Sequence, residues 1–245
     1  MSIFMIVDNQ YIYEGIRNLV EEINLNEKID FFYSYHNVAF RKRYCNDDIF
    51  CPVSLKKCTE DFWKQYDVFF SFHCKQLFPD ALVKNHRCIN IHPGFNPYNR
   101  GWFPQVFSIL NQQPIGVTIH EMDSEIDHGP IIYQEEVLIE SYDTSYDVYQ
   151  KILQKEMEML RRNLYSLVKG EYNAVSVKAI GNINYKEDFN RLCKLKLDQV
   201  GTLGEHINLL RALTFEGYKN AYFEEGSKKI YTSIKFEIEE NQMRN

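Results

Sequence analysis

Several signatures of nucleotide chemistry and of hydrolysis are missing from this chain of 245 residues. The first apolar run is followed by DNQYIYEG, which contains neither the GxGxxG fingerprint of dinucleotide sites nor the GxxxxGK[ST] phosphate loop. GxSxG is absent too, which argues against a hydrolase whose serine nucleophile stands on a strand-to-helix elbow. The sequence therefore suggests neither NAD binding, nor ATP hydrolysis, nor a serine hydrolase.

Long apolar runs and a surplus of basic residues are lacking as well. The N-terminal run IFMIV is too short for a signal peptide or a membrane span, and no later run reaches about 18 apolar residues. The net charge of -6 provides no positive field for a phosphate backbone. The six cysteines form no CxxC pair and are expected to be reduced thiols. We therefore expect a cytoplasmic protein with neither a nucleic acid nor a membrane as partner.

Short apolar segments that alternate with helical patterns indicate the fold class. Strands are expected at residues 3–7, 29–35, 67–73, 87–92, 116–122 and 131–139. Near-continuous apolar strands that alternate with helices predict an α/β sheet covered on both faces. The best-marked helix comes next, because Thr144 and Asp147 form a capping-box-like start and Gly170 supplies the stop.

A change of pattern after this helix predicts two domains, residues 1–178 and a small α+β unit of residues 179–245. The second unit is expected to contain a helix at 202–213 and a β-hairpin whose second strand runs through KIYTSIKFEIEE. That strand alternates strictly, with Ile230, Thr232, Ile234, Phe236 and Ile238 on one face. Because a lone hairpin is marginally stable, this face must pack on its own domain or on a second copy of the chain.

The stretch INIHPGFNPYNRGW, residues 89–102, is the first candidate site. Asn90 and His92 lie two positions apart on a strand, so both side chains face the same side where PG turns the chain away. In open α/β sheets, ligands bind at this carboxyl edge. A second stretch, GVTIHEMDSEIDHGPII, repeats the pattern with a strand that ends at His120 and a polar loop that carries Asp127. Convergence of this amide, imidazole and carboxylate would supply an oxyanion donor, a proton acceptor and a stabilising charge.

Two alternatives remain open at this point. A lone NxH at a strand end also suits an ordinary turn. The residues His120, Asp123, Asp127 and His128 are legitimate metal ligands, although no HxxxH pattern or cysteine pair fixes a coordination geometry.

Taken together, INIHPGFNPYNRGWFPQVFSILN and QPIGVTIHEMDSEIDHGPII resemble the paired signatures of the formyltransferases that use 10-formyltetrahydrofolate. The resemblance covers residues 67–140 well and the N-terminal units loosely. Within that group, NPYNRGW and the tail RALTFEGYKNAYFEEGSKKIY look most like the sugar N-formyltransferases that act on dTDP-linked amino-dideoxysugars. The resemblance implies a Rossmann-like N-terminal formyltransferase domain with 10-formyltetrahydrofolate as co-substrate and no metal.

The resemblance also implies roles for individual residues. The family's catalytic triad falls on Asn90, His92 and Asp127. Segments 71–79 and 122–127 would line the folate crevice, through Phe72, Leu77, Phe78, Pro79, Met122 and Asp123. The NPYNRGW loop would lie beside the sugar nucleotide, with contacts from Asn96, Tyr98, Asn99, Arg100 and Trp102. Relatives that bind phosphate after the first strand have glycines there, whereas this chain has Asp8, Asn9 and Gln10, which places the diphosphate elsewhere, near Arg100.

The reaction implied by the resemblance is formyl transfer to the amine of a dTDP-linked amino-dideoxyhexose that serves a surface polysaccharide. The best candidate for the acceptor is dTDP-4-amino-4,6-dideoxyglucose. A 3-amino-3,6-dideoxyhexose acceptor and simple hydrolysis of formyltetrahydrofolate are the alternatives. Because the sugar-formylating relatives are commonly dimers, we expect a homodimer formed by the C-terminal unit, with the active site wholly in the first domain.

Overall fold

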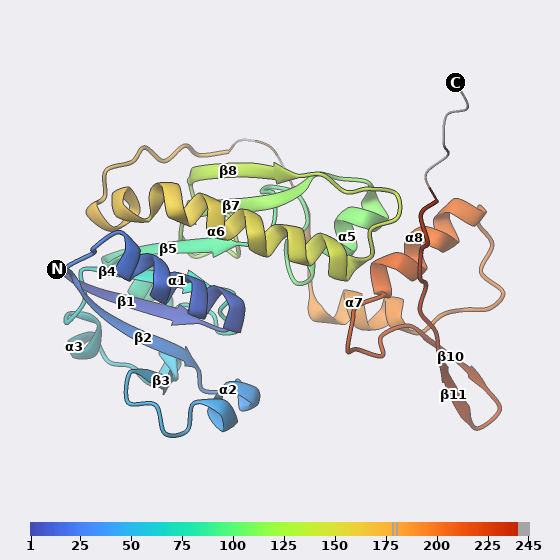
Figure 1. The fold of residues 1–245 in the computed structure, drawn as a ribbon, viewed down its shortest axis with the longest axis horizontal. Coiled ribbons are helices and arrows are strands. Elements are labelled where there is room, and N and C mark those ends of the chain that lie inside the picture. The colour runs from blue at the N-terminus through green and yellow to red at the C-terminus, as the bar shows by residue number, and fades with distance from the viewer. Residues whose placement is uncertain (178, 180, 240–245) are drawn as a thin grey trace.

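The computed structural model describes residues 1–177, 179 and 181–239. Its centre is a seven-stranded sheet in the order β3-β2-β1-β4-β5-β7-β8 (Figure 1). The first five strands in the chain are parallel: β1 (Ser2–Val7), β2 (Lys28–Ser34), β3 (Phe50–Val53), β4 (Val68–Phe72) and β5 (Arg87–His92). β7 (Ile115–Glu121) is antiparallel to its neighbour β5, and β8 (Ile131–Val137) is antiparallel to β7. The expected α/β, Rossmann-like class is confirmed.

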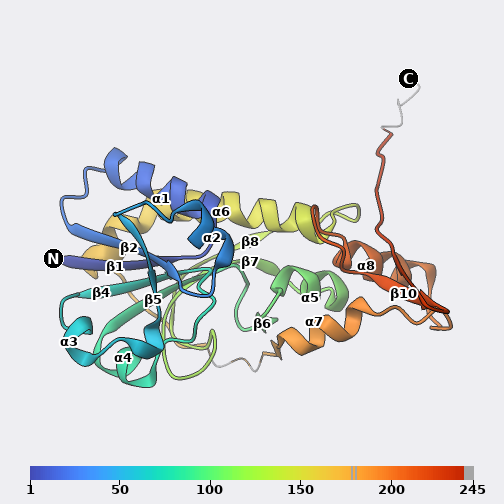
Figure 2. The same cartoon turned by 90° about the horizontal axis from the view of Figure 1, so that it is seen from below.

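Helices cover both faces of the sheet (Figure 2). On one face, α1 (Gln10–Glu22) and α6 (Ser145–Lys169) pack on the main hydrophobic core. On the other face, α3 (Glu60–Trp63) and α4 (Asp80–Asn85) pack on a smaller core. The short helices α2 (Val38–Arg43) and η1 (Leu55–Lys57) precede α3 in the chain. The run IFMIV places β1 between these layers, because none of its five side chains has exposed surface.

The long helix α6 begins and ends where its sequence predicts. The Asp147 N–H donates to Thr144 Oγ1, and the Thr144 N–H donates back to the Asp147 carboxylate at 2.8 Å. Gly170 ends the helix at φ 75°, a left-handed conformation that favours glycine. Neither α6 nor any other helix in the described part of the chain is long and apolar enough to cross a membrane.

The chain beyond α6 forms β9 (Ile183–Asn184), α7 (Lys186–Cys193), α8 (Leu203–Leu213) and a hairpin of β10 (Tyr222–Glu225) and β11 (Lys228–Tyr231). This C-terminal unit lies at one end of the sheet and its helices, where α8 packs against α5 (Pro104–Asn111) (Figure 1). The buried Arg211 guanidinium on α8 donates to the carbonyl oxygens of Glu140 at 3.1 Å and Asp143 at 2.8 Å. These bonds join the unit to the loop before α6.

The expected length of the second hairpin strand is wrong, because β11 ends at Tyr231. The Thr232 N–H still donates to the Ala221 carbonyl at 3.0 Å, and the Ile234 N–H donates to Thr214 Oγ1 at 3.1 Å. Residues up to 239 then run away from the hairpin without pairing to any described strand (Figure 1). Alternating apolar residues predict an extended segment, but a strand also needs a partner, and the four-residue β10 supplies none beyond this point.

Candidate active site

Asn90 and His92 lie near the carboxyl end of β5, at the edge where β1, β4 and β5 end together. Val7 pairs with Phe72 and Phe72 pairs with Ile91, so the residues that follow these strands are neighbours along one edge. Asn90 and His92 are both buried, with exposed fractions of 9% and 4%. Their alternate positions put both side chains on the same side of the sheet, as the sequence predicts.

Asp127 reaches these side chains by a route that the sequence did not indicate. β7 is antiparallel to β5, and Glu121 at its end pairs with Ile89, so the two strands do not end at the same edge. The loop 122–130 folds back, with Asp127 in the left-handed region at φ 48°. Gly129 lies so close to the Glu121 carbonyl that a Cβ would be 1.9 Å from its oxygen. The apparent repeat of the strand-end pattern was misleading, yet the amide, imidazole and carboxylate do meet.

The Asp127 carboxylate lies at the centre of the site. Its Oδ1 accepts from Asn90 Nδ2 at 2.9 Å, and its Oδ2 accepts from the Gly101 N–H at 3.0 Å. Oδ2 also lies 3.4 Å from His92 Nδ1. Burial would raise the pKa of Asp127, but the imidazoles of His92 and His120 and the Gly101 N–H outweigh burial and lower this pKa to about 2. Asp127 is therefore ionised at neutral pH.

His92 is neutral at neutral pH, because burial lowers the pKa of its imidazole to about 4 in spite of the attraction of Asp127. Its buried Nε2 has no hydrogen-bond partner within the described part of the chain. The imidazole lies against Gly94, where a Cβ would be 2.3 Å from Nε2. A neutral ring with one unpartnered nitrogen, and a carboxylate behind the other, can accept a proton.

His120 is held at the same site in a fixed tautomer. Its Nδ1 lies 2.7 Å from the Glu121 carbonyl oxygen, which can only accept, so Nδ1 carries the proton. Its Nε2 is then an acceptor and lies 3.3 Å from Asn90 Nδ2. Asp123 pairs instead with the exposed His128, with 2.7 Å between Asp123 Oδ2 and His128 Nδ1. The side chains weighed as metal ligands are thus divided between two places, and no group of three or more suited to a metal ion occurs among the described residues.

Two of the residues predicted to contact the sugar nucleotide are buried inside the protein. Asn96 is 5% exposed, and its Nδ2 donates to the Asp127 carbonyl oxygen at 2.8 Å. Asn99 has no exposed surface, and its Nδ2 donates to Ser108 Oγ at 3.0 Å. The Asn99 side chain therefore holds the loop in place from inside the protein.

The other three residues of this group are accessible. Tyr98 and Arg100 are half-buried, and Arg100 Nη1 donates to the Ile126 carbonyl oxygen at 3.3 Å. The buried Arg100 Nε has no partner within the described residues. Trp102 is exposed, and the Lys186 ammonium lies 5.5 Å from the centre of its ring. These side chains can meet a ligand at the loop surface.

The residues predicted to line the folate crevice also differ in exposure. Phe72 lies wholly in the main core, so its side chain faces the protein interior. Phe78 and Met122 are half-buried, and both pack on the smaller core. Leu77 is 76% exposed, and Pro79 precedes the first turn of α4. Phe78, Pro79 and Met122, which are half-buried, and the exposed Leu77 are therefore the members of this set that retain exposed apolar surface.

Asp8 gives the physical reason why the edge after β1 differs from a phosphate site. Its Oδ1 accepts from the Ser34 N–H and from Asn37 Nδ2, both at 3.0 Å, and its Oδ2 accepts from the Lys75 N–H at 2.9 Å. The carboxylate thus uses the donors that a bound phosphate would need. Its negative charge would also repel a phosphate, which agrees with placing the diphosphate elsewhere.

Sequence reasoning missed a second buried polar group next to this edge. Glu156 of α6 has no exposed surface, and His73 Nε2 lies 2.8 and 3.0 Å from its two carboxylate oxygens. Tyr149 Oη lies 3.1 Å from His73 Nδ1 and accepts from Asn9 Nδ2 at 2.9 Å. Burial raises the pKa of Glu156, while the His73 imidazole opposes this shift. A signal was present, because Glu156 lies four residues before Leu160 on the apolar stripe of the helix.

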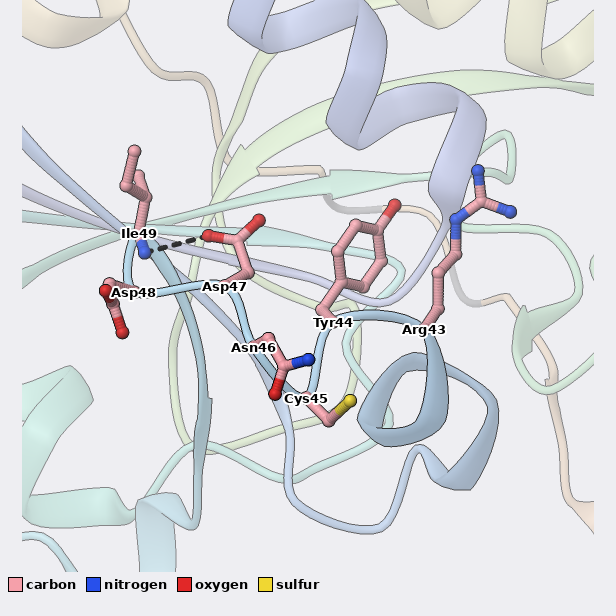
Figure 3. A pocket seen from close by; sticks show the side chains of 7 residues that line it. All are labelled: Arg43, Tyr44, Cys45, Asn46, Asp47, Asp48 and Ile49. Carbon is pink, nitrogen blue, oxygen red and sulfur yellow. Dashed lines mark hydrogen bonds between the residues drawn. The ribbon is translucent and has the colours of Figure 1, made fainter.

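A shallow hollow of about 460 Å³ lies elsewhere, in the loop between α2 and β3 (Figure 3). It is lined by residues 43–49, and the Ile49 N–H donates to Asp47 Oδ1 at 2.8 Å within it. None of the predicted site residues lines this hollow, and β3 is the edge strand farthest from β8. It is therefore separate from the candidate site.

Comparison with known protein families matches two parts of the chain. Residues 62–164 match the family described as formyl transferase. Residues 188–239 match the family described as N-formyltransferase dimerization C-terminal domain.

Comparison with individual proteins gives relatives that extend over most of the chain. The dTDP-4-amino-4,6-dideoxyglucose formyltransferases of Mycobacterium bovis and Mycobacterium tuberculosis are 49% identical over 177 residues, which cover 72% of this chain and 76% of each relative. The structure of a sugar N-formyltransferase from a Shewanella species has a TM-score of 0.92 at 41% identity and covers 98% of this chain and 99% of that one. A 4-N formyltransferase from Francisella tularensis has a TM-score of 0.91 at 41% identity, with coverage of 97% and 98%.

Proposed function

Since the chain belongs to the formyltransferase family, we propose that it transfers the formyl group of 10-formyltetrahydrofolate to the 4-amine of dTDP-4-amino-4,6-dideoxyglucose. The observation that carries this acceptor is the 49% identity to enzymes named for that sugar, over 76% of their length. The buried amide, imidazole and carboxylate around β5 supply the side chains that such a transfer needs.

His92 acts as the base in this proposal. A neutral amine attacks the formyl carbon, and its nitrogen must lose a proton as the new C–N bond forms. His92 Nε2 takes this proton, and the Asp127 carboxylate, 3.4 Å from Nδ1, stabilises the resulting imidazolium. His92 then returns the proton to the folate nitrogen as that nitrogen's bond to the formyl carbon breaks. The protein thus ends the reaction in its starting protonation state.

Asn90 is proposed to stabilise the negative charge that develops on the formyl oxygen. Its Nδ2 lies 2.9 Å from Asp127 Oδ1 and 3.3 Å from His120 Nε2, so the two amide hydrogens face these two acceptors. The longer contact, to His120, is the one that an oxyanion can replace. One donor of this kind contributes about 3 kcal/mol to transition-state stabilisation, or roughly 100-fold in rate.

Unpartnered polar atoms at this edge fit the binding of an extended polar ligand. His92 Nε2, Asn96 Oδ1 and Arg100 Nε are all buried without a partner in the described part of the chain. Because buried polar atoms are normally hydrogen-bonded, three such atoms on one short segment indicate that a ligand completes them. We assign Phe78 and Met122 to the folate ring and Arg100 to the sugar nucleotide.

The acceptor can be tested with a panel of dTDP-sugars that carry the amine at C4 or C3, in both configurations at C4. Each sugar is incubated with the protein and 10-formyltetrahydrofolate, and mass spectrometry detects the formylated product. We expect fastest turnover with dTDP-4-amino-4,6-dideoxyglucose, and preference for a 3-amino sugar would overturn this acceptor. Release of tetrahydrofolate at the same rate without any sugar would favour the hydrolase alternative.

We also propose a cytoplasmic homodimer. Residues 188–239 match a family named for dimerization, and the C-terminal unit exposes Val200 (97%), Leu203 (75%) and Ile238 (64%). Exposed apolar side chains grouped on one unit are typical of an interface. The six cysteines are all unpaired thiols, as expected in a reducing compartment.

A further inference from the structure

A small parallel sheet outside the central sheet joins the loop after β5 to the segment after α6. It pairs β6 (Arg100–Gly101) with β9, so that Arg100 faces Ile183 and Gly101 faces Asn184. Figure 2 shows β6 next to the chain that leads into α7. The segment 181–184 lies between the two regions matched by known families, at residues 62–164 and 188–239.

This pairing aims one backbone donor at Asp127. The Arg100 N–H donates to the Asn182 carbonyl oxygen at 3.0 Å, and the Trp102 N–H donates to the Asn184 carbonyl oxygen at 2.9 Å. Successive N–H groups along an extended strand point in opposite directions. The Gly101 N–H between them therefore points away from β9, toward Asp127 Oδ2 at 3.0 Å.

Asn99, which lies directly before β6, is the centre of a cluster of four asparagines that includes Asn182 and Asn184 of the second segment and Asn111 at the end of α5. Asn99 Oδ1 accepts from Asn182 Nδ2 at 2.7 Å, from Asn111 Nδ2 at 2.8 Å and from Asn184 Nδ2 at 3.3 Å. The Asn99 N–H donates in return to Asn182 Oδ1 at 2.9 Å. Asn182 thus makes a reciprocal pair of bonds with Asn99, and this pair fixes the loop immediately before β6.

Close backbone approach makes the same junction rigid. A Cβ on Gly181 would lie 1.7 Å from the Pro97 carbonyl oxygen, so only glycine fits at this contact. Gly101 adopts φ 88°, and a Cβ there would lie 2.5 Å from the Asn184 carbonyl oxygen. Nothing larger can enter between the two segments without separating them.

We propose that Asn99, Asn182 and Asn184 are positioning residues for the reaction, because they hold β6 on β9 and thereby keep the Gly101 N–H on the Asp127 carboxylate. This inference rests on the proposed function for the role of Asp127. Residues 181–184, which follow the long helix α6, would then help to hold the active site in place. The sequence instead predicts an active site wholly within residues 1–178.

The physical contact is tested first, without substrate. In Asn182→Ala, we expect amide hydrogen exchange in a peptide spanning residues 98–103 to become faster by about tenfold or more, because the reciprocal bonds to Asn99 are lost. Asn220→Ala is the matched control, since Asn220 Nδ2 donates at 3.1 Å to the Leu213 carbonyl oxygen, away from this loop. Unchanged exchange at residues 98–103 in Asn182→Ala would overturn the proposal whether or not the protein formylates a sugar.

The consequence for turnover is tested next. We expect Asn182→Ala to lower kcat by about 10- to 100-fold, since a small displacement of a catalytic group has effects of this size. The KM for the dTDP-sugar should change by less than about threefold. Asn184→Ala, which removes only the 3.3 Å contact, should show a smaller loss and provides a second variant if Asn182→Ala is unstable.

A pH profile separates positioning from general weakening of the fold. Asp127 is faced by His92, His120, Asn90 and the Gly101 N–H, and loss of the last donor raises its pKa. The acid limb of kcat should therefore move to higher pH in Asn182→Ala but not in Asn220→Ala, with the same amine as acceptor in both. A lower kcat with an unshifted acid limb, or faster exchange with unchanged kcat, would refute the positioning role.

Discussion

Removal of the His92 imidazole takes away the proposed base and leaves the proposed ligand contacts of the 96–102 loop in place. We expect His92→Asn to lower kcat by about 100-fold or more, because the amine proton then has no acceptor at the reacting atoms. Affinity for the dTDP-sugar, measured by calorimetry, should stay within about threefold of wild type. A folded His92→Asn protein with near wild-type kcat would show that another group takes the proton.

The buried neutral state of His92 also predicts how stability depends on pH. The unfolded chain protonates this histidine below its ordinary value of 6.5, whereas the folded protein does so only near a pKa of about 4. The unfolded state therefore binds more protons between these values, and stability falls as the pH is lowered through this window. Protonation of this residue therefore lowers the free energy of unfolding by roughly 3 kcal/mol across the window.

Urea unfolding of wild type and His92→Asn from pH 7 to pH 4 measures this contribution. Most groups common to both proteins cancel in the difference. Asp127 does not, because the His92 imidazole lowers its pKa and the variant lacks this imidazole. A raised pKa of Asp127 favours the variant at low pH, so the wild type should lose roughly 3 kcal/mol or more relative to the variant across the window. Asp127 contributes in the same direction only at lower pH, from 3.8 down to a pKa of about 2. A difference between the two proteins that does not change with pH would show that His92 is not buried in its neutral form.

The charge of Asp127 can be removed with little change of shape. Asn tolerates the left-handed backbone that Asp127 adopts at φ 48°, so Asp127→Asn should fold with the loop in place. We expect folate affinity near that of wild type but a kcat lower by about tenfold or more, because an amide does not stabilise the imidazolium. Fluorescence titration with folate and saturation kinetics measure the two effects. Lost folate affinity with unchanged kcat at saturation would indicate a binding role instead.

The placement of a site residue was predictable where it depends only on nearby residues in the sequence. The shared side of Asn90 and His92 follows from side-chain alternation along a strand that ends at a turn. The contact of Asp127 with them was implied by the family resemblance, but the sequence did not indicate that the loop 122–130 folds back to make it. The bonds of Asn99 to Asn182 and Asn184 were not predictable, because these partners lie 83 and 85 residues away along the chain. Sequence spacing carries no information on such contacts.

At the scale of elements, the buried pair that links α6 to the end of β4 gives a test of its own. Glu156→Ala leaves His73 without its buried acceptor and should destabilise the protein by about 3 to 5 kcal/mol in urea unfolding. Glu156→Gln keeps an acceptor oxygen for His73 Nε2 and should cost about 1 kcal/mol. Equal losses in the two variants would show that the carboxylate charge of Glu156, and not an acceptor oxygen or packing, stabilises this contact.

Most central elements were predictable because their local signals are strong. The apolar runs of β1 and β5 and the caps of α6 define those elements without tertiary information. The direction of β7 was not predictable, since an apolar alternation is the same in a parallel and an antiparallel strand. The prediction of a strand through residues 232–239 was wrong for a related reason, because strand pairing depends on a neighbouring strand that the segment itself does not specify.

At the scale of the whole molecule, the apolar residues of that segment predict the oligomeric state. Ile234 and Phe236 are half-buried on one protomer, and we expect a second copy to cover the rest of this face. Replacement of both by Asp should yield monomers in analytical ultracentrifugation, because buried carboxylates at an apolar interface oppose association. Ile49→Asp is the control, since Ile49 is a 59% exposed apolar residue at the far edge of the sheet. A folded double variant that remains dimeric would place the interface elsewhere.

The bonds of the Arg211 guanidinium to the Glu140 and Asp143 carbonyls limit how freely the C-terminal unit can be exchanged for that of another protein. A C-terminal unit grafted from a relative would have to present an arginine at this place, or leave the buried Asp143 carbonyl without the Arg211 donor. Exchange of the unit alone is therefore an unsuitable route to chimeric enzymes. The loop 138–144 has to be transferred with the C-terminal unit, because the two form a single structural part although they are far apart in the sequence.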